Sequence, residues 1–139
     1  MRRLRAQSLL EFALVVPLLV GLVVATLLVA RVLWSHQVVW ALAGEAARAG
    51  ALGGTAAQAE ARARDRAAEM AQDAQLDGER LHVEVDTGRF ARGGRVAVSA
   101  SYTVLPLADI GPLAGAGSWV VDARAEEPVD RFRSGVASP

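Results

Sequence analysis

The clearest pattern in the chain is an uncharged apolar run near its beginning. No residue from Phe12 to Ala30, a stretch of 19 residues, carries a charge. As a helix rising about 1.5 Å per residue, this run would span roughly 28 Å of a hydrocarbon layer about 30 Å thick. Pro17 and Gly21 lie inside it, and helices in lipid tolerate both because neighbouring groups re-satisfy the freed backbone. The pattern predicts a transmembrane helix within residues 7–31.

A secretory signal peptide is the competing interpretation, because it also places an apolar stretch after a basic start. The run is longer than the apolar core of roughly 7 to 15 residues that such peptides carry. In addition, Glu11 stands at its front edge, and the nearest A-x-A triplet begins only at Ala41. We therefore expect the segment to remain part of the protein.

The residues that flank the run predict its orientation. Three arginines precede it, whereas two follow it within the next twenty residues: Arg2, Arg3 and Arg5 against Arg31 and Arg48. The positive-inside rule then places the N-terminus in the cytoplasm and the C-terminal region outside. Trp34 and Trp40 follow the span. Their indoles suit either the outer membrane interface or packing along a helix stripe.

Beyond Arg31 the pattern becomes mixed, as in a helix that continues outward. Its expected stripe has three-to-seven-residue spacing and comprises Leu33, Trp40, Gly44, Ala47 and Ala51. Gly53-Gly54 ends this helix, and Thr55 with Gln58 predicts a capping box that starts a second helix over about 56–75. The alanine-rich face of the second helix suits close packing against a sheet or a neighbouring subunit.

Past Gly78 the hydrophobic period changes to two, which predicts strands. Leu81, Val83 and Val85 alternate with polar residues, and residues 96–104 give the longest strand pattern. A third strand is expected from Trp119 to Glu126, after a loop of Gly and Pro residues at 107–117, and Pro128 closes it.

This order predicts an α+β fold: a long N-terminal transmembrane helix continues into an Ala/Arg-rich helical stalk, and a small antiparallel three-stranded β region follows. The expected division is a basic leader (1–6), the transmembrane helix (7–31), an extracytoplasmic stalk (32–76), the β region (77–128) and a flexible tail (129–139).

Composition and charge narrow the function. The chain is 53% hydrophobic and only 5% aromatic, a balance suited to helices that pack closely or cross lipid. Fifteen basic residues, all arginine, balance fifteen acidic ones, so no global field favours nucleic acid. The absence of cysteine excludes disulfides and thiolate sites.

Catalytic patterns are weak. His36 and His82 are far apart in sequence and have no clustered acids at ligand spacing, so no metal site is expected. Gly115–Ser118 lacks the G-x-S-x-G elbow, and nothing in the sequence indicates that Asp86, Asp109 and Asp122 converge. We expect no enzyme activity, no cofactor and no small-molecule substrate.

Glu11 is the residue that needs an explanation. It interrupts an apolar stretch that otherwise begins at Leu9, and an acid at the centre of a membrane helix costs about 2.5 to 3.5 kcal/mol, less toward the end. One explanation is that Glu11 reaches the headgroups and lies near the positive end of the helix dipole.

A second explanation comes from the local sequence. The string QSLLEFALVVPLL, preceded by Ala6, resembles a class III prepilin signal and, more narrowly, the opening of TadE-like proteins, which are minor pilins or pseudopilins of the tight-adherence (Tad, or Flp) pilus machinery. The resemblance implies that a prepilin peptidase cuts between Ala6 and Gln7, with Glu11 fifth and Phe12 sixth in the product. The chain departs from the family at Ala6, where Gly is usual and leaves the backbone less hindered.

The resemblance also implies a partner for the acid. Cleavage would create an α-amine on Gln7, and in pilin-like assemblies such an amine pairs with the fifth-position Glu of a neighbour. Two unit charges about 4 Å apart interact by about 4 kcal/mol at an effective dielectric near 20. Glu11 and Phe12 are thus the expected assembly residues, and Ala6 and Gln7 the processing residues.

Two functions remain open. In the first, the chain is a minor pilin or pseudopilin in the bacterial cytoplasmic membrane; its partners would be the membrane, the peptidase, other pilins and Tad assembly proteins. In the second, it is an uncleaved single-pass anchor with an extracytoplasmic partner-binding domain.

Overall fold

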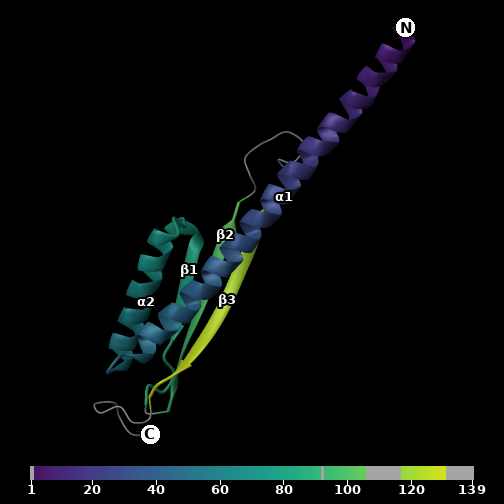
Figure 1. The fold of residues 1–139 in the computed structure, drawn as a ribbon. Coiled ribbons are helices and arrows are strands. Elements are labelled where there is room, and N and C mark those ends of the chain that lie inside the picture. Colours follow the sequence, from purple (N-terminus) through teal and green to yellow (C-terminus); the bar gives the residue numbers. More distant parts are fainter. Residues whose placement is uncertain (1, 92, 106–116, 131–139) are drawn as a thin grey trace.

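The computed structural model describes residues 2–91, 93–105 and 117–130, and for residues 2–10 the backbone alone. Its elements are the helices α1 (Arg2–Ala51) and α2 (Ala56–Asp73), the 3-10 turn η1 (Gly78–Arg80) and the strands β1 (Leu81–Asp86), β2 (Arg95–Val104) and β3 (Trp119–Pro128). Figure 1 shows α1 as a long rod whose C-terminal half packs with α2 and the sheet, while its N-terminal half extends beyond the sheet. The predicted α+β class is confirmed, including the long apolar helix and the three-stranded antiparallel sheet.

The break between α1 and α2 occurs at the predicted glycines. A Cβ added to Gly53 would lie 2.5 Å from the backbone nitrogen of Ala59, so no side chain fits where the two helices turn past each other. Thr55 caps α2 because its hydroxyl accepts from the Gln58 N–H at 3.2 Å. The Gln58 side chain returns to the N–H of Gly54 at 3.1 Å rather than to that of Thr55, a one-residue variant of the expected capping box.

The C-terminal end of α2 is a Schellman motif. The Leu76 N–H donates to the Ala71 carbonyl at 2.8 Å, and the Gln75 N–H donates to the Gln72 carbonyl at 2.9 Å. Gln75 occupies the left-handed position at φ 54°. The helix therefore ends at Asp73, two residues before the predicted end.

Small residues form the contact between the helices. The buried face of α1 includes Ser35, Val39, Leu42, Ala43, Ala46 and Ala47. The fully buried alanines of α2 are Ala59 and Ala63. The predicted continuation of the helix beyond Arg31 is confirmed, because α1 runs unbroken to Ala51. Of the residues in the expected stripe, Ala47 is buried, whereas Leu33 is 60% exposed and Trp40 65% exposed. The buried face of α1 therefore combines two larger side chains, Val39 and Leu42, with small ones that allow close packing.

The sheet has the order β1-β2-β3, with both pairs antiparallel. The predicted alternation in β2 is confirmed: Val96, Val98, Ala100, Tyr102 and Val104 are buried in the same core as α1 and α2. Leu81, Val83 and Val85 pack against this core from β1, also as predicted.

The third strand extends to Pro128, slightly past the predicted Glu126. Val129, which falls in the predicted tail, is only 1% exposed, and its N–H donates to the Gly94 carbonyl at 2.9 Å. The rest of the predicted tail, from 131 on, and all but the end of the predicted loop at 107–117 lie outside the described residues.

Candidate membrane and assembly site

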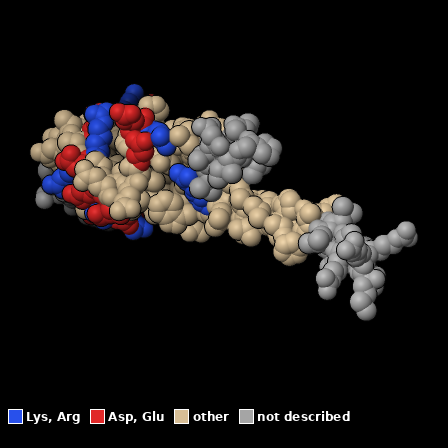
Figure 2. All heavy atoms as spheres, turned by 90° about the horizontal axis from the view of Figure 1, so that it is seen from above, with Lys and Arg blue, Asp and Glu red and all other residues tan. Residues whose placement is uncertain are grey.

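Most of the N-terminal half of α1 is an apolar rod that no other element covers within the part of the chain that the structure describes. In the most apolar part of the helix, none of the residues is buried by the rest of the protein. On the face of the molecule seen in Figure 2, the part of the rod drawn in tan shows no charged atoms, whereas the charged side chains gather over the other end. Apolar surface exposed in this way costs about 25 cal/mol per Å² in water. Its length and composition are those of a helix that crosses a membrane.

Thr26, Pro17 and Gly21 are the residues of the rod that could disturb a membrane helix. The Thr26 hydroxyl donates to the Leu22 carbonyl at 2.8 Å, so this side chain leaves no unsatisfied donor toward lipid. The helix continues through Pro17 and Gly21, and a Cβ at Gly21 would meet nothing within 4 Å. Both residues therefore lie inside an unbroken helix.

Two charges bracket the rod. Glu11 and Arg31 are both exposed and separated by 20 helical residues, which corresponds to about 30 Å along the axis. Glu11 forms no hydrogen bond or ion pair with any side chain that the structure describes. Phe12 follows it, 69% exposed. The distance between the two charges matches the thickness of a bilayer's hydrocarbon layer.

The predicted processing bond lies in the same helix. Ala6 and Gln7 have helical backbone within α1, and Gln7 is one turn before Glu11. The structure therefore brings Gln7, Glu11 and Phe12 together at one end of the rod. Whether these residues act in processing or assembly stays a prediction.

Among the three acids considered in the sequence, the two that the structure describes do not converge. Asp86 ends β1, where its Oδ1 accepts from the Gly88 N–H at 2.9 Å. Asp122 lies on β3, opposite Ser101 of β2. In the sheet register the two acids are four residues apart along the strands, about 13 Å. Asp109 and the first half of Gly115–Ser118 lie outside the described residues.

Metal ligands do not assemble either within the described part of the chain. No group of three or more His, Cys, Asp or Glu side chains there could hold a metal ion. His36 lies exposed on α1, and His82 is exposed on β1.

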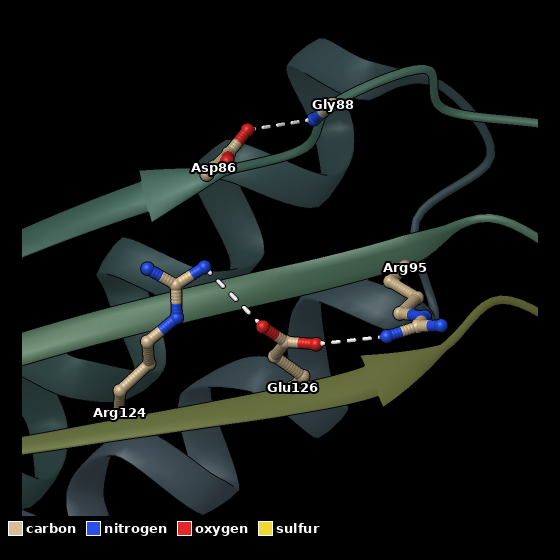
Figure 3. Close-up of polar contacts among 5 residues, drawn as sticks. All are labelled: Asp86, Gly88, Arg95, Arg124 and Glu126. Carbon is tan, nitrogen blue, oxygen red and sulfur yellow. Dashed lines mark hydrogen bonds and ion pairs between the residues drawn. The ribbon is translucent and has the colours of Figure 1, made fainter.

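The sheet face opposite the helices is polar and open. It forms a shallow hollow of about 400 Å³, whose lining includes His82, Glu84, Ser99, Ser101, Asp122 and Arg124. Beside it, Figure 3 shows Glu126 between two arginines, with Oε2 3.3 Å from Arg95 and Oε1 3.2 Å from Arg124. Such exposed pairs contribute about 0 to 1 kcal/mol each. This face is a solvated surface on which Glu126 is paired with both arginines.

One contact of the rod was not predicted. Trp119, treated in the sequence only as the start of a strand, lines an apolar hollow of about 370 Å³ together with five residues of α1: Ala25, Leu28, Val29, Val32 and Leu33. The sequence does indicate that Trp119 could have a special role, since this large aromatic residue follows a stretch rich in glycine. The pairing with α1 joins segments about 90 residues apart, and no local pattern reports it.

Comparison with known proteins gives a match to the N-terminal part of the chain, which contains the apolar rod. Residues 6–48 match the family described as TadE-like protein. The match begins at Ala6 and includes Gln7, Glu11, the apolar rod and most of the rest of α1. The predicted resemblance to TadE-like proteins is confirmed over this segment, which is less than a third of the chain. No match was found among curated proteins or solved structures.

Proposed function

We propose that this chain is a minor pilin or pseudopilin of a Tad-type pilus system, processed after Ala6 and assembled through its N-terminal helix. The observation that carries the proposal is the exposed apolar rod with Glu11 at its end, within the segment that matches TadE-like proteins. The rod supports a membrane-anchored protein, and a helix that the fold leaves uncovered is free to pack against other helices.

The orientation follows from the flanking charges. Arg2, Arg3 and Arg5 lie in the cytoplasm, and the sheet and α2 lie outside. The processing bond is then on the cytoplasmic side, and cleavage removes all three arginines. The first turns of α1 must open to admit a peptidase, because helical backbone keeps its N–H and C=O groups paired. The first four N–H groups of a helix lack such a partner. The bond between Ala6 and Gln7 comes just after these groups, so only the end of the helix has to open.

Glu11 supplies the assembly contact in this proposal. It has no partner among the described side chains, and its position at the membrane edge leaves the carboxylate in a region where charge is costly. The amine that cleavage creates on Gln7 of a neighbouring copy or a related pilin would offset that cost. Phe12 packs beside the pair and helps to fix the register between helices.

Cleavage is tested by the mass of the chain in cells that contain a prepilin peptidase. The expected product begins at Gln7. Ala6→Leu is expected to abolish cleavage because the bulky side chain crowds the scissile bond. Ala13→Leu, the same change within the apolar run, is expected to leave cleavage intact. An intact Met1 in the unaltered protein would contradict the proposal and would favour the uncleaved single-pass anchor with an outer partner-binding domain.

The Glu11 contact is tested separately by the amount of protein incorporated into isolated pili or Tad complexes. We expect Glu11→Gln to lower incorporation at least about tenfold, since a tenfold change corresponds to only 1.4 kcal/mol of an interaction of about 4 kcal/mol. Glu84→Gln makes the same change on the exposed sheet face and should have no effect. Equal incorporation of Glu11→Gln and the unaltered chain would exclude the pairing role.

A further inference from the structure

The beginning of β3 lies beside the part of α1 that crosses the membrane. Trp119 faces Ala25, Val29 and Leu33 across the apolar hollow. Ala25 precedes Arg31 by six residues, which places it about 9 Å closer to the membrane centre. A residue of the sheet thus reaches the level of α1 at which the hydrocarbon layer ends.

The side chains at this corner of the sheet are apolar and partly or largely exposed. Trp119 is 39% exposed, and Leu105 and Val120 are exposed beside it. Val104 pairs with Trp119 across β2 and β3, so Leu105 and Trp119 leave the sheet at the same end. No residue from Val96 to Leu105 is charged, and on β3 the first charge is Asp122. Figure 1 shows this end of β2 and β3 pointing along α1 toward its N-terminal half.

We propose that this corner, defined by Leu105, Trp119 and Val120, lies in the outer interfacial layer of the bilayer that α1 crosses. The occupant is lipid because the apolar surface of the corner is continuous with that of the membrane-spanning rod. Indole rings favour the membrane–water interface, where the ring is apolar and the N–H remains wet. The unpaired backbone at the sheet edges keeps the corner from going deeper, since hydrocarbon satisfies no N–H or C=O group.

The other side of the sheet limits the depth further. Leu81 pairs with Tyr102, so Arg80 lies close to the level of the corner. Arg80 forms a 3.1 Å ion pair with Asp77. These charges suit the headgroup layer and not the hydrocarbon, so only the β2–β3 corner reaches the apolar edge.

The placement distinguishes the three tryptophans. Trp34 follows Arg31 by about 4.5 Å along α1 and lies in the interface with Trp119, whereas Trp40 lies about 13 Å beyond Arg31 and is in water. The folded part of the protein is seated on the lipid with a fixed orientation. This inference rests on the membrane anchoring of α1 and not on processing or pilus assembly, so either proposal can fail without the other.

The test uses the fluorescence of two full-length variants that each keep one exposed indole. Trp34→Phe with Trp40→Phe leaves Trp119, and Trp34→Phe with Trp119→Phe leaves Trp40. Each is reconstituted in vesicles of phosphatidylcholine and phosphatidylglycerol, with iodide present on both sides. In a second set of vesicles, the phosphatidylcholine is brominated near the start of its acyl chains. Far-UV circular dichroism verifies that both variants keep the same fold.

We expect brominated lipid to quench Trp119 several-fold more strongly than Trp40, and iodide to quench Trp40 several-fold more strongly than Trp119. Two results would overturn the proposal. If iodide quenches both indoles equally, the corner lies in water. If neither iodide nor brominated lipid quenches Trp119, protein covers the corner, as in contact with a second copy.

Discussion

Gln75 shows how one residue adjusts the stability of the folded part. It occupies the left-handed position of the Schellman motif that ends α2, where an L-residue costs roughly 1 to 2 kcal/mol. Glycine avoids this cost but loses about 0.5 to 1 kcal/mol through the greater freedom of the unfolded chain. The local hydrogen bonds of the motif are unchanged by the substitution because they involve the backbone alone.

We therefore predict that Gln75→Gly raises the free energy of unfolding by about 0.5 to 1 kcal/mol. Thermal unfolding in detergent, followed by circular dichroism, should show a midpoint higher by several degrees. Gln72→Gly provides the control: the same change at an exposed position within α2 should lower the midpoint, because glycine weakens a helix interior by about 1 kcal/mol. A lower midpoint in both variants would mean that position 75 carries no strain.

At the scale of elements, some features followed directly from the sequence and others did not. The strands were predictable because a period of two places alternate residues on opposite faces: β2 buries the expected residues, and β1 partly buries them. The boundary between the helices was predictable because Gly53 and Thr55 act locally. The buried face of α1 was not. More than one face of α1 is apolar, and only the approach of α2 and the sheet decides which one is covered.

The small residues between α1 and α2 therefore carry a prediction of their own. Ala63 is fully buried, and a Cβ placed on Gly50 would already be 3.3 Å from that of Ala63. Ala63→Leu must push the helices apart, which should lower the free energy of unfolding by about 1 to 3 kcal/mol. The thermal midpoint in detergent measures this loss.

Ala61→Leu is the matched control for this change. Ala61 lies two residues earlier on the exposed face of α2, and Leu and Ala have similar helix propensities, so we expect no loss of stability. If Ala63→Leu were as stable as Ala61→Leu, the two helices would not be held at close contact by their small residues.

The whole molecule separates into an apolar rod and a charged folded part. Among the described residues, the exposed apolar side chains are concentrated on the first half of α1, and the ion pairs lie from Glu45 onward. This division and the position of Glu11 were predictable, because an uncharged run and its end are local properties of the sequence. The meeting of Trp119 with α1 was not predictable, because it depends on how long the strands are and where the chain returns.

The separation implies that membrane binding can be removed without unfolding the rest. Leu18 and Leu22 are exposed near the middle of the rod, so arginine at both positions disturbs no packing in the folded part. At the centre of a membrane helix, each arginine costs about 2.5 to 3.5 kcal/mol and each lost leucine adds up to about 0.6, giving roughly 6 to 8 kcal/mol for the pair of substitutions.

We predict that Leu18→Arg with Leu22→Arg moves the protein out of the membrane fraction that resists alkaline extraction. Leu52→Arg with Ala61→Arg adds the same charge at exposed positions of the folded part and should leave the protein in that fraction. If the first variant also stayed in the membrane, the rod alone would not hold the protein there. The remaining contact would then have to come from the corner at Trp119 or from an assembled partner, and combining the two arginines with Trp119→Ser would separate these cases: loss of the protein from the membrane would identify the corner, and retention would identify the partner.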